Sequence, residues 1–137
     1  MANIISPSAI IRGDIVGNNC WIHDNVVIQN DAIIKNNVAI MSMALVGPDT
    51  VVDDHCFLGA RCTVGGGSVI GRQSFVGLNC TILDDTVIGE KCILGASTVV
   101  KRNVPNYSLY KVSSDMIIKT YSIESIEEKL VYSSNVR

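Results

Sequence analysis

Every sixth residue from position 4 to position 100 is isoleucine, valine or leucine, seventeen residues without a slip. A period of six fits neither an α-helix nor an alternating β-strand. It is typical of a hexapeptide β-helix, in which each repeat supplies one short strand and one corner. The residues in this aliphatic column are Ile4, Ile10, Val16, Ile22, Ile28, Ile34, Ile40, Val46, Val52, Leu58, Val64, Ile70, Val76, Ile82, Ile88, Leu94 and Val100.

Three repeats complete one triangular turn, so residues eighteen apart are expected to stack, and seventeen repeats predict about 5.7 coils. The aliphatic column is expected to point inward, and no extra residue interrupts the count of six. The position after it is rich in glycine, which we expect at corners whose backbone conformation disfavours a Cβ. These glycines are Gly17, Gly47, Gly59, Gly65, Gly71, Gly77, Gly89 and Gly95.

The position before the aliphatic column is expected to point outward, yet it is largely apolar. Two such apolar faces exceed what a monomer of this size usually exposes, which favours oligomerisation through them. One face carries Ile15, Ile33, Val51, Val69 and Val87, and the other carries Trp21, Ala39, Phe57, Phe75 and Ile93.

The repeat stops near Pro105, since proline ends strand pairing. We expect an extended return segment from Tyr107 to Ile118. Ser125 and Glu128 have capping-box spacing, which predicts a short helix over residues 123–132 that covers the open end. The domain boundaries expected are therefore 1–105 for the β-helix and 106–137 for the return segment and capping helix.

Composition narrows the class of protein. The 137 residues fit one domain, and a net charge of −2 without a basic stripe argues against a nucleic-acid partner. No apolar run approaches the roughly 20 residues of a membrane span, and no signal peptide is visible, so we expect a cytoplasmic protein. All five cysteines occupy a column of small residues, which favours inert core packing over a reactive or paired thiol.

Several segments resemble the left-handed β-helix domain of bacterial sugar acetyltransferases. They are Ile5–Ala9, Gly65–Gly67, Phe75–Asn79 and Gly95–Pro105. The resembling group acetylates sialic acid, bacillosamine, perosamine and similar surface sugars. The resemblance implies an all-β, left-handed parallel β-helix that forms a homotrimer and binds acetyl-coenzyme A between neighbouring prisms. It also implies a sugar acceptor of bacterial surface polysaccharide biosynthesis.

The resemblance also assigns candidate site residues. The family's catalytic histidine would occupy position 48, where this chain has Pro48, and further family histidines would match Leu45 and Arg61. The glycine whose amide faces the acetyl carbonyl in the family is retained as Gly66. Expected coenzyme contacts are Gly66, Gly77, Asn79, Gly95, Ala96 and Lys101, and expected substrate contacts are Pro48, Asp49 and Arg61. The alternative for Lys101 is a solvated charge at the end of the prism, and the alternative for Arg61 is a replacement of the family histidine without a role.

Acetyl transfer needs a nucleophile, a proton acceptor and stabilisation of the tetrahedral oxyanion. The Gly66 amide is the candidate oxyanion donor, unless it is simply a corner glycine. His55, which follows two aspartates, and His23 are the candidate bases. A third option needs no side-chain base, because an amine can release its proton to water or to the departing thiolate. An amino-sugar acceptor is therefore favoured over a hydroxyl.

Two alternatives come from other functional classes. A β-helix that lacks the usual catalytic histidine can serve as a structural or assembly subunit instead of an enzyme. The β-helix carbonic anhydrases hold zinc with three histidines per site, which the two histidines of this chain cannot supply, so we expect no metal.

Overall fold

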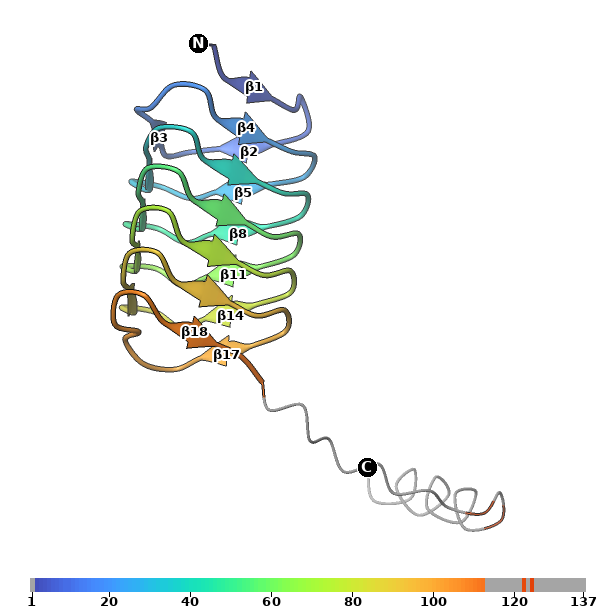
Figure 1. The fold of residues 1–137 in the computed structure, drawn as a ribbon. Helices are drawn as coiled ribbons and strands as arrows, with labels where there is room; N and C mark the ends of the chain where they lie inside the picture. The colour runs from blue at the N-terminus through green and yellow to red at the C-terminus, as the bar shows by residue number, and fades with distance from the viewer. Residues whose placement is uncertain (1, 113–121, 123, 125–137) are drawn as a thin grey trace.

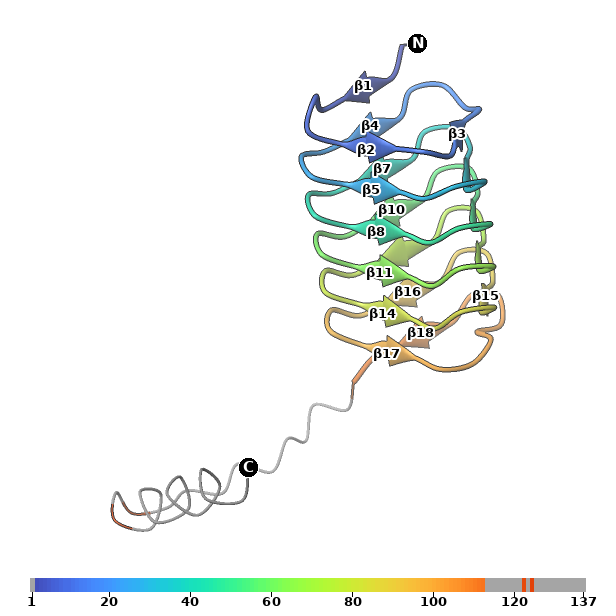
Figure 2. The same ribbon diagram turned by 180° about the vertical axis from the view of Figure 1, so that it is seen from behind.

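The computed structural model describes residues 2–112, 122 and 124. These residues form eighteen strands of two residues each, arranged in three parallel sheets that make the sides of a triangular prism. The chain winds around the prism in about six turns, from β1 at one end to β17 and β18 at the other (Figures 1 and 2). The predicted all-β parallel β-helix is therefore confirmed. The predicted capping helix at 123–132 lies, apart from Glu124, outside the described residues.

Strands from successive coils stack within each sheet. Sheet A contains β1 (Ile4–Ile5), β4 (Trp21–Ile22), β7 (Ala39–Ile40), β10 (Phe57–Leu58), β13 (Phe75–Val76), β16 (Ile93–Leu94) and β18 (Leu109–Tyr110). Sheet B contains β2 (Ile10–Ile11), β5 (Val27–Ile28), β8 (Leu45–Val46), β11 (Thr63–Val64), β14 (Thr81–Ile82) and β17 (Val99–Val100). Sheet C contains β3 (Asp14–Ile15), β6 (Ile33–Ile34), β9 (Val51–Val52), β12 (Val69–Ile70) and β15 (Val87–Ile88).

From β4 to β17 the register is the one predicted. Residues eighteen apart are partners, as Phe57 is with Ala39 and Phe75, and Leu58 with Ile40 and Val76. The aliphatic column from Ile22 to Val100 is almost completely buried and forms one continuous core. Burial of this column is the main source of stability, since each apolar side chain fully removed from water contributes about 1.5–3 kcal/mol.

The first coil contradicts the predicted register. Ile4, Ile10 and Val16 are 66%, 48% and 64% exposed instead of pointing into the core. The positions one residue away take their place, so Ile15 packs inward rather than outward. The partners in this coil are Ile5 with Ile22, Ile11 with Ile28, and Ile15 with Ile34, which are 17, 17 and 19 residues apart.

At each of these positions two aliphatic residues are adjacent in the sequence, so the repeat pattern alone could not show which of them points into the core. Ile15 follows Ile11 by four positions instead of six, and this short corner requires glycine at position 13, because a Cβ there would clash with the Ala32 carbonyl oxygen. Ile22 then follows Ile15 by seven positions. The count of six is therefore interrupted in the first coil.

The last coil is shorter than the others. Val104 forms a bridge with Ile88, and Tyr110 of β18 is the partner of Leu94, each pair sixteen residues apart. Part of the expected return segment is thus a seventh strand of sheet A. The domain boundary at residue 105 remains a prediction.

One residue at each regular corner adopts the left-handed conformation. Aspartate and asparagine are common there because their short polar side chains tolerate positive φ. The positions are Asn19, Asn25, Asp31, Asn37, Met43, Asp49, His55, Arg61, Gly67, Gln73, Asn79, Asp85, Lys91 and Ser97. Of the described glycines, Gly67 alone shares this conformation.

The glycine column therefore has a different physical reason from the one expected. At Gly47, an added Cβ would lie 2.6 Å from the Gly66 nitrogen of the next coil. At Gly77 it would lie 2.6 Å from the Ala96 nitrogen. These glycines permit close approach between the backbones of successive coils, and the left-handed turn lies two residues further along the chain.

The column of small inward residues is confirmed as core. All five cysteines are free and buried, and burial raises the pKa of the Cys56 thiol to about 11 and that of Cys62 to about 12. Many residues in this column also donate a hydrogen bond to the carbonyl oxygen fifteen residues later. These pairs are Cys20–Lys35, Thr50–Gly65, Cys56–Gly71, Ser68–Leu83, Ser74–Gly89 and Cys80–Gly95.

Candidate functional site

The predicted site residues are distributed over the three corners of the prism. The corner between sheets A and B (the A–B corner) carries Arg61, Gly77, Asn79, Gly95 and Ala96. The corner between sheets B and C (the B–C corner) carries Pro48, Asp49, Gly66 and Lys101, and the remaining C–A corner carries His55. A single chain therefore brings together the predicted residues of one corner, but it holds the residues of different corners on different edges of the prism.

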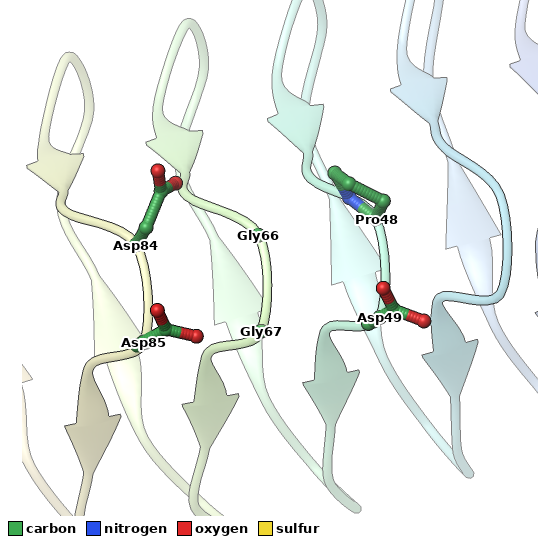
Figure 3. A pocket seen from close by; sticks show the side chains of 6 residues that line it. All are labelled: Pro48, Asp49, Gly66, Gly67, Asp84 and Asp85. Carbon is green, nitrogen blue, oxygen red and sulfur yellow. The ribbon is translucent and has the colours of Figure 1, made fainter.

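The B–C corner holds a cavity of about 380 Å³ that spans three successive coils. Pro48 and Asp49 lie on the first coil, the bare backbone of Gly66 and Gly67 on the second, and Asp84 and Asp85 on the third (Figure 3). The Gly67 N–H donates to the Pro48 carbonyl oxygen at 2.8 Å, and the Asp85 N–H donates to the Gly66 carbonyl oxygen at 2.9 Å. These bonds fix the three coils that line the cavity.

The Gly66 N–H and the Asp84 N–H are the two backbone donors of this cavity that have no acceptor among the described residues. Some residues at the same place in the repeat donate their N–H to a neighbouring side chain, as Asn36 does to Asp54 and Glu90 does to Asn106. No acceptor within residues 2–112 takes the Gly66 N–H. A free, rigidly placed N–H beside a cavity is the kind of group that stabilises a developing oxyanion.

Three carboxylates give this cavity a negative charge. Asp49, Asp84 and Asp85 are exposed and flank the glycine backbone on both sides. Their side chains lie on either side of Gly66 and Gly67 in Figure 3. The part of the chain that the structure describes contributes no lysine or arginine to the cavity lining. The local field therefore attracts cations, including protonated amines, and disfavours anionic groups.

The A–B corner offers a second surface, built mainly from backbone. The Gly95 carbonyl oxygen accepts hydrogen bonds from the buried Cys80 thiol at 3.0 Å and the buried Thr98 hydroxyl at 2.9 Å. Asn79 donates to the Ser97 hydroxyl one coil further on at 3.3 Å. These contacts hold the Gly95–Ala96 turn in one conformation.

Sequence reasoning missed Lys111 at this corner. It follows β18, and a Cβ on Gly95 would lie 3.1 Å from the Lys111 Cβ. Lys101, the predicted cation, instead begins the B–C corner after β17. Lys111 follows the last repeat, so no periodic signal could have placed it beside Gly95.

His55 is exposed at the C–A corner and belongs to a ladder of side chains. Asn19 donates to Asn37 at 2.7 Å, and Asn37 Nδ2 lies 3.1 Å from His55 Nδ1. When Asn37 donates to Nδ1, the proton of the neutral ring is on Nε2. Within one chain, the structure does not bring His55 together with Gly66.

Arg61 and His23 also lie away from the B–C cavity. Both are at the A–B corner, with Arg61 in the fourth coil and His23 in the second. Neither side chain lines the cavity that holds Pro48 and Asp49. The predicted substrate residues are therefore split between two edges of the prism.

The outer face of sheet A is the most apolar exposed surface. Phe57 and Phe75 stack with their ring centroids 4.9 Å apart and an interplanar angle of 3°. Trp21 is 52% exposed and Ile93 is 52% exposed on the same face. On sheet C, the corresponding outward valines are half-buried apart from Val87.

The described part of the chain lacks two kinds of feature. It has no group of three histidine, cysteine, aspartate or glutamate side chains arranged to hold a metal ion. It also has no helix of the length and hydropathy that a membrane span requires.

Comparison with known families supports the repeat. A model described as bacterial transferase hexapeptide (six repeats) matches residues 67–102, and one described as hexapeptide repeat of succinyl-transferase matches residues 50–69. No curated protein sequence matches the chain.

Solved structures of sugar acetyltransferases share the fold. A perosamine N-acetyltransferase from Caulobacter crescentus, in complex with CoA and GDP-perosamine, is 28% identical with a TM-score of 0.79 over 88% of this chain and 58% of that chain. A mutant of that enzyme with asparagine in place of a histidine gives 27% identity, a TM-score of 0.80 and the same coverage. The chain thus spans less than two thirds of the length of these enzymes.

The acetyltransferase domain of PglB from Neisseria gonorrhoeae, in complex with acetyl coenzyme A, supports the fold alone. It is 24% identical with a TM-score of 0.70, over 80% of this chain and 51% of that chain. The resemblance to hexapeptide-repeat sugar acetyltransferases is confirmed.

Proposed function

We propose that this chain is an acetyl-coenzyme A-dependent acetyltransferase whose acceptor is the amino group of a bacterial surface sugar. The observation that carries the proposal is the free Gly66 N–H beside the B–C cavity. The similar enzymes bind CoA and a sugar nucleotide, which supports the same reaction class here.

The reaction is attack of the acceptor nitrogen on the thioester carbonyl carbon. A C–N bond forms, the carbonyl oxygen becomes an oxyanion, and the C–S bond then breaks to release the coenzyme thiolate. The Gly66 N–H stabilises the oxyanion, a contribution that typically amounts to about 10²- to 10³-fold in rate. The amine proton leaves to water or to the thiolate.

The carboxylates of the B–C cavity favour an amine over a hydroxyl or an acidic sugar. Asp49, Asp84 and Asp85 attract a protonated amine, and a carboxylate can accept its proton before attack. An amine also needs less base assistance than a hydroxyl, which suits Pro48 at the position of the family's catalytic histidine. In this proposal, His55 has no direct role in the B–C cavity of its own chain.

The coenzyme surface is the A–B corner of a neighbouring subunit. Gly77, Asn79, Gly95 and Ala96 line an edge other than the one that carries Gly66, and the negative cavity disfavours the coenzyme phosphates. A homotrimer in which the A–B corner of one prism faces the B–C corner of the next unites the two halves. Lys111 then supplies the cation beside the coenzyme, with Lys101 and Arg61 at the margins.

We place the protein in the cytoplasm. Its five thiols are all free and buried, which suits a reducing compartment, and acetyl-coenzyme A is a substrate of such a compartment.

The second candidate function is a structural subunit without activity, favoured by Pro48 alone. A transfer assay with radiolabelled acetyl-coenzyme A distinguishes these two functions. Its acceptors are paired, each amino sugar with its hydroxyl counterpart. Transfer to the amines supports the proposal. No transfer, together with no coenzyme binding at millimolar concentration in calorimetry, contradicts it and leaves the structural function.

A further inference from the structure

A second cavity lies at the outer edge of sheet A, where the first coil departs from the regular register. Its volume is about 310 Å³. It is separate from the B–C cavity and shares no lining residue with it. Its lining includes Ile4, Ser6, Pro7, Trp21, His23 and Asp24.

His23 presents an unusual buried atom in this cavity wall. Its Nε2 is shielded from solvent and has no hydrogen-bond partner within the described part of the chain. Buried polar atoms are nearly always paired, so an unpaired nitrogen at a cavity indicates a partner from outside the described residues. In the tautomer that carries its proton on Nδ1, Nε2 is an acceptor.

Trp21 supplies a flat aromatic surface next to this nitrogen. The indole is 52% exposed, and its ring centroid lies 4.3 Å from that of His23 at an angle of 39°. An exposed indole face attracts organic cations, and it stacks best with a planar one.

Asp24 supplies the charge. One of its carboxylate oxygens accepts a hydrogen bond from the Ser6 hydroxyl, and the side chain remains exposed. Among the described residues no lysine or arginine lines the cavity, so none of them gives the carboxylate a cationic partner there. A ligand that carries phosphate is disfavoured, and a ligand with several N–H donors and a positive charge is favoured.

We infer that this cavity binds a guanidinium group on a short apolar stem, the chemistry of an arginine side chain. The planar cation stacks on Trp21, donates to the Asp24 carboxylate, and donates a further N–H to His23 Nε2. The stem lies along Ile4 and Pro7, as arginine methylenes commonly do on apolar surfaces. The site is independent of acetyl transfer and adds a binding function to the N-terminal end of the solenoid.

Trp21 is the single tryptophan of the chain, so its fluorescence reports directly on this cavity. The test titrates the full chain with N-acetyl-argininamide, with its neutral isostere N-acetyl-citrullinamide, and with N-acetyl-lysinamide. We expect the arginine compound to shift the emission at millimolar concentration or below. The citrulline compound, which lacks the charge, is expected to bind about tenfold more weakly or less.

Variants make the test specific. His23→Ala and Asp24→Asn are each expected to weaken binding of N-acetyl-argininamide about tenfold. His55→Ala, which removes the other histidine at a distant corner, is the matched control and is expected to change nothing. Unchanged thermal unfolding of His23→Ala shows that its effect is on binding, since the lost nitrogen has no partner among the described residues.

A Gly-Arg-Gly peptide blocked at both ends distinguishes two sources of the guanidinium group, a partner polypeptide and a free small molecule. Tighter binding of the peptide than of N-acetyl-argininamide assigns the site to a partner polypeptide, and equal binding assigns it to a free small molecule. Equal responses to the arginine and citrulline compounds overturn the inference. So does the absence of any response, or unaltered binding by both His23→Ala and Asp24→Asn. None of these outcomes bears on acetyl transfer, which is measured separately.

Discussion

The Pro48 ring lies against the open side of Gly66: a Cβ on Gly66 would lie 3.1 Å from Pro48 Cδ. The two residues occupy the same place in successive coils, eighteen positions apart. The side chain at position 48 therefore stands next to an amide of the B–C cavity that has no acceptor among the described residues. A base at position 48 would act directly beside the oxyanion donor.

Pro48→His is expected to raise the turnover of acetyl transfer, because general-base assistance typically contributes about 10²- to 10⁴-fold. The proline ring carries no N–H and the backbone there loses no hydrogen bond on substitution. Turnover of the variant should rise with pH through the ordinary pKa of an imidazole, about 6.5. Steady-state kinetics against pH provide the measurement.

Pro48→Ala is the control, since it removes the ring without adding an imidazole. An equal gain in Pro48→Ala and Pro48→His would attribute the effect to the lost ring. No gain in Pro48→His, with coenzyme binding intact, would contradict the position assigned to the base.

The sequence predicted most of the fold because one periodicity carries both the strands and the core. It was wrong where Ile4–Ile5, Ile10–Ile11 and Ile15–Val16 place two aliphatic residues side by side. Either member of each pair satisfies the pattern, and a shift by one residue reverses which side chain is buried. The tight corner at Gly13 and pairing with the second coil decide the register, and neither is visible in the period.

The candidate site was less predictable for a related reason. Position in the repeat correctly placed Gly66 beside Pro48, because the coil spacing is regular there. It could not show that Asp84 and Asp85 complete that cavity, or that Lys111 reaches Gly95 from the return segment. Those neighbours depend on which corner each turn occupies and on the path of the chain after the last repeat.

The proposed homotrimer predicts a mass of about three times 14.7 kDa, measurable by light scattering or sedimentation at micromolar protein concentration. Val69→Asp and Phe75→Asp each place a carboxylate on one of the two outward apolar faces. The variant whose face lies at the contact should dissociate, because it buries an unpaired charge. A monomer mass for the unmodified chain is the contrary result.

Ser74→Ala is expected to reduce the free energy of unfolding by about 1–3 kcal/mol. The buried Ser74 hydroxyl donates to the Gly89 carbonyl oxygen at 2.8 Å and accepts from the Cys92 N–H at 3.0 Å. Ser74→Cys should recover part of the loss, because cysteines in the same column donate to the equivalent carbonyl. Chemical denaturation of the three proteins measures the differences.

Cys62→Ala is the matched comparison, because its thiol donates no hydrogen bond to another described residue. Its expected cost is about 1 kcal/mol, from the lost sulfur alone. A larger loss for Cys62→Ala than for Ser74→Ala would show that packing, and not hydrogen bonding, decides the energetics of this column.

Stability in acid should depend on Glu90. Arg72 Nε donates to its carboxylate at 2.9 Å and the Tyr107 hydroxyl donates at 3.0 Å, and these bonds hold the pKa of Glu90 below its usual 4.5. A carboxyl group whose pKa is lower in the folded state stabilises the fold at a pH above its pKa in the unfolded chain. This contribution is lost as the pH falls through its pKa in the folded state. Glu90→Gln should therefore melt at a lower temperature than the unmodified chain at pH 7.

The difference in melting temperature between Glu90→Gln and the unmodified chain should shrink as the pH falls below 4.5. All three side chains are near the surface, so the effect is small and weakens with salt. A difference that stays constant between neutral and acidic pH would show that the charge of Glu90 does not stabilise the last coil.

Acetyl transfer by Gly66→Pro and Gly66→Ala tests the role of the Gly66 amide most directly. Both variants place a Cβ against the Pro48 ring, but only Gly66→Pro removes the N–H. Pro48, which also follows a glycine, shows that the backbone at this place in the repeat accepts proline. With an amino-sugar acceptor and both proteins folded, turnover of Gly66→Pro should be about 10²- to 10³-fold below that of Gly66→Ala. Equal turnover in the two variants, or no transfer by the unmodified chain, would contradict an acetyltransferase that uses this amide.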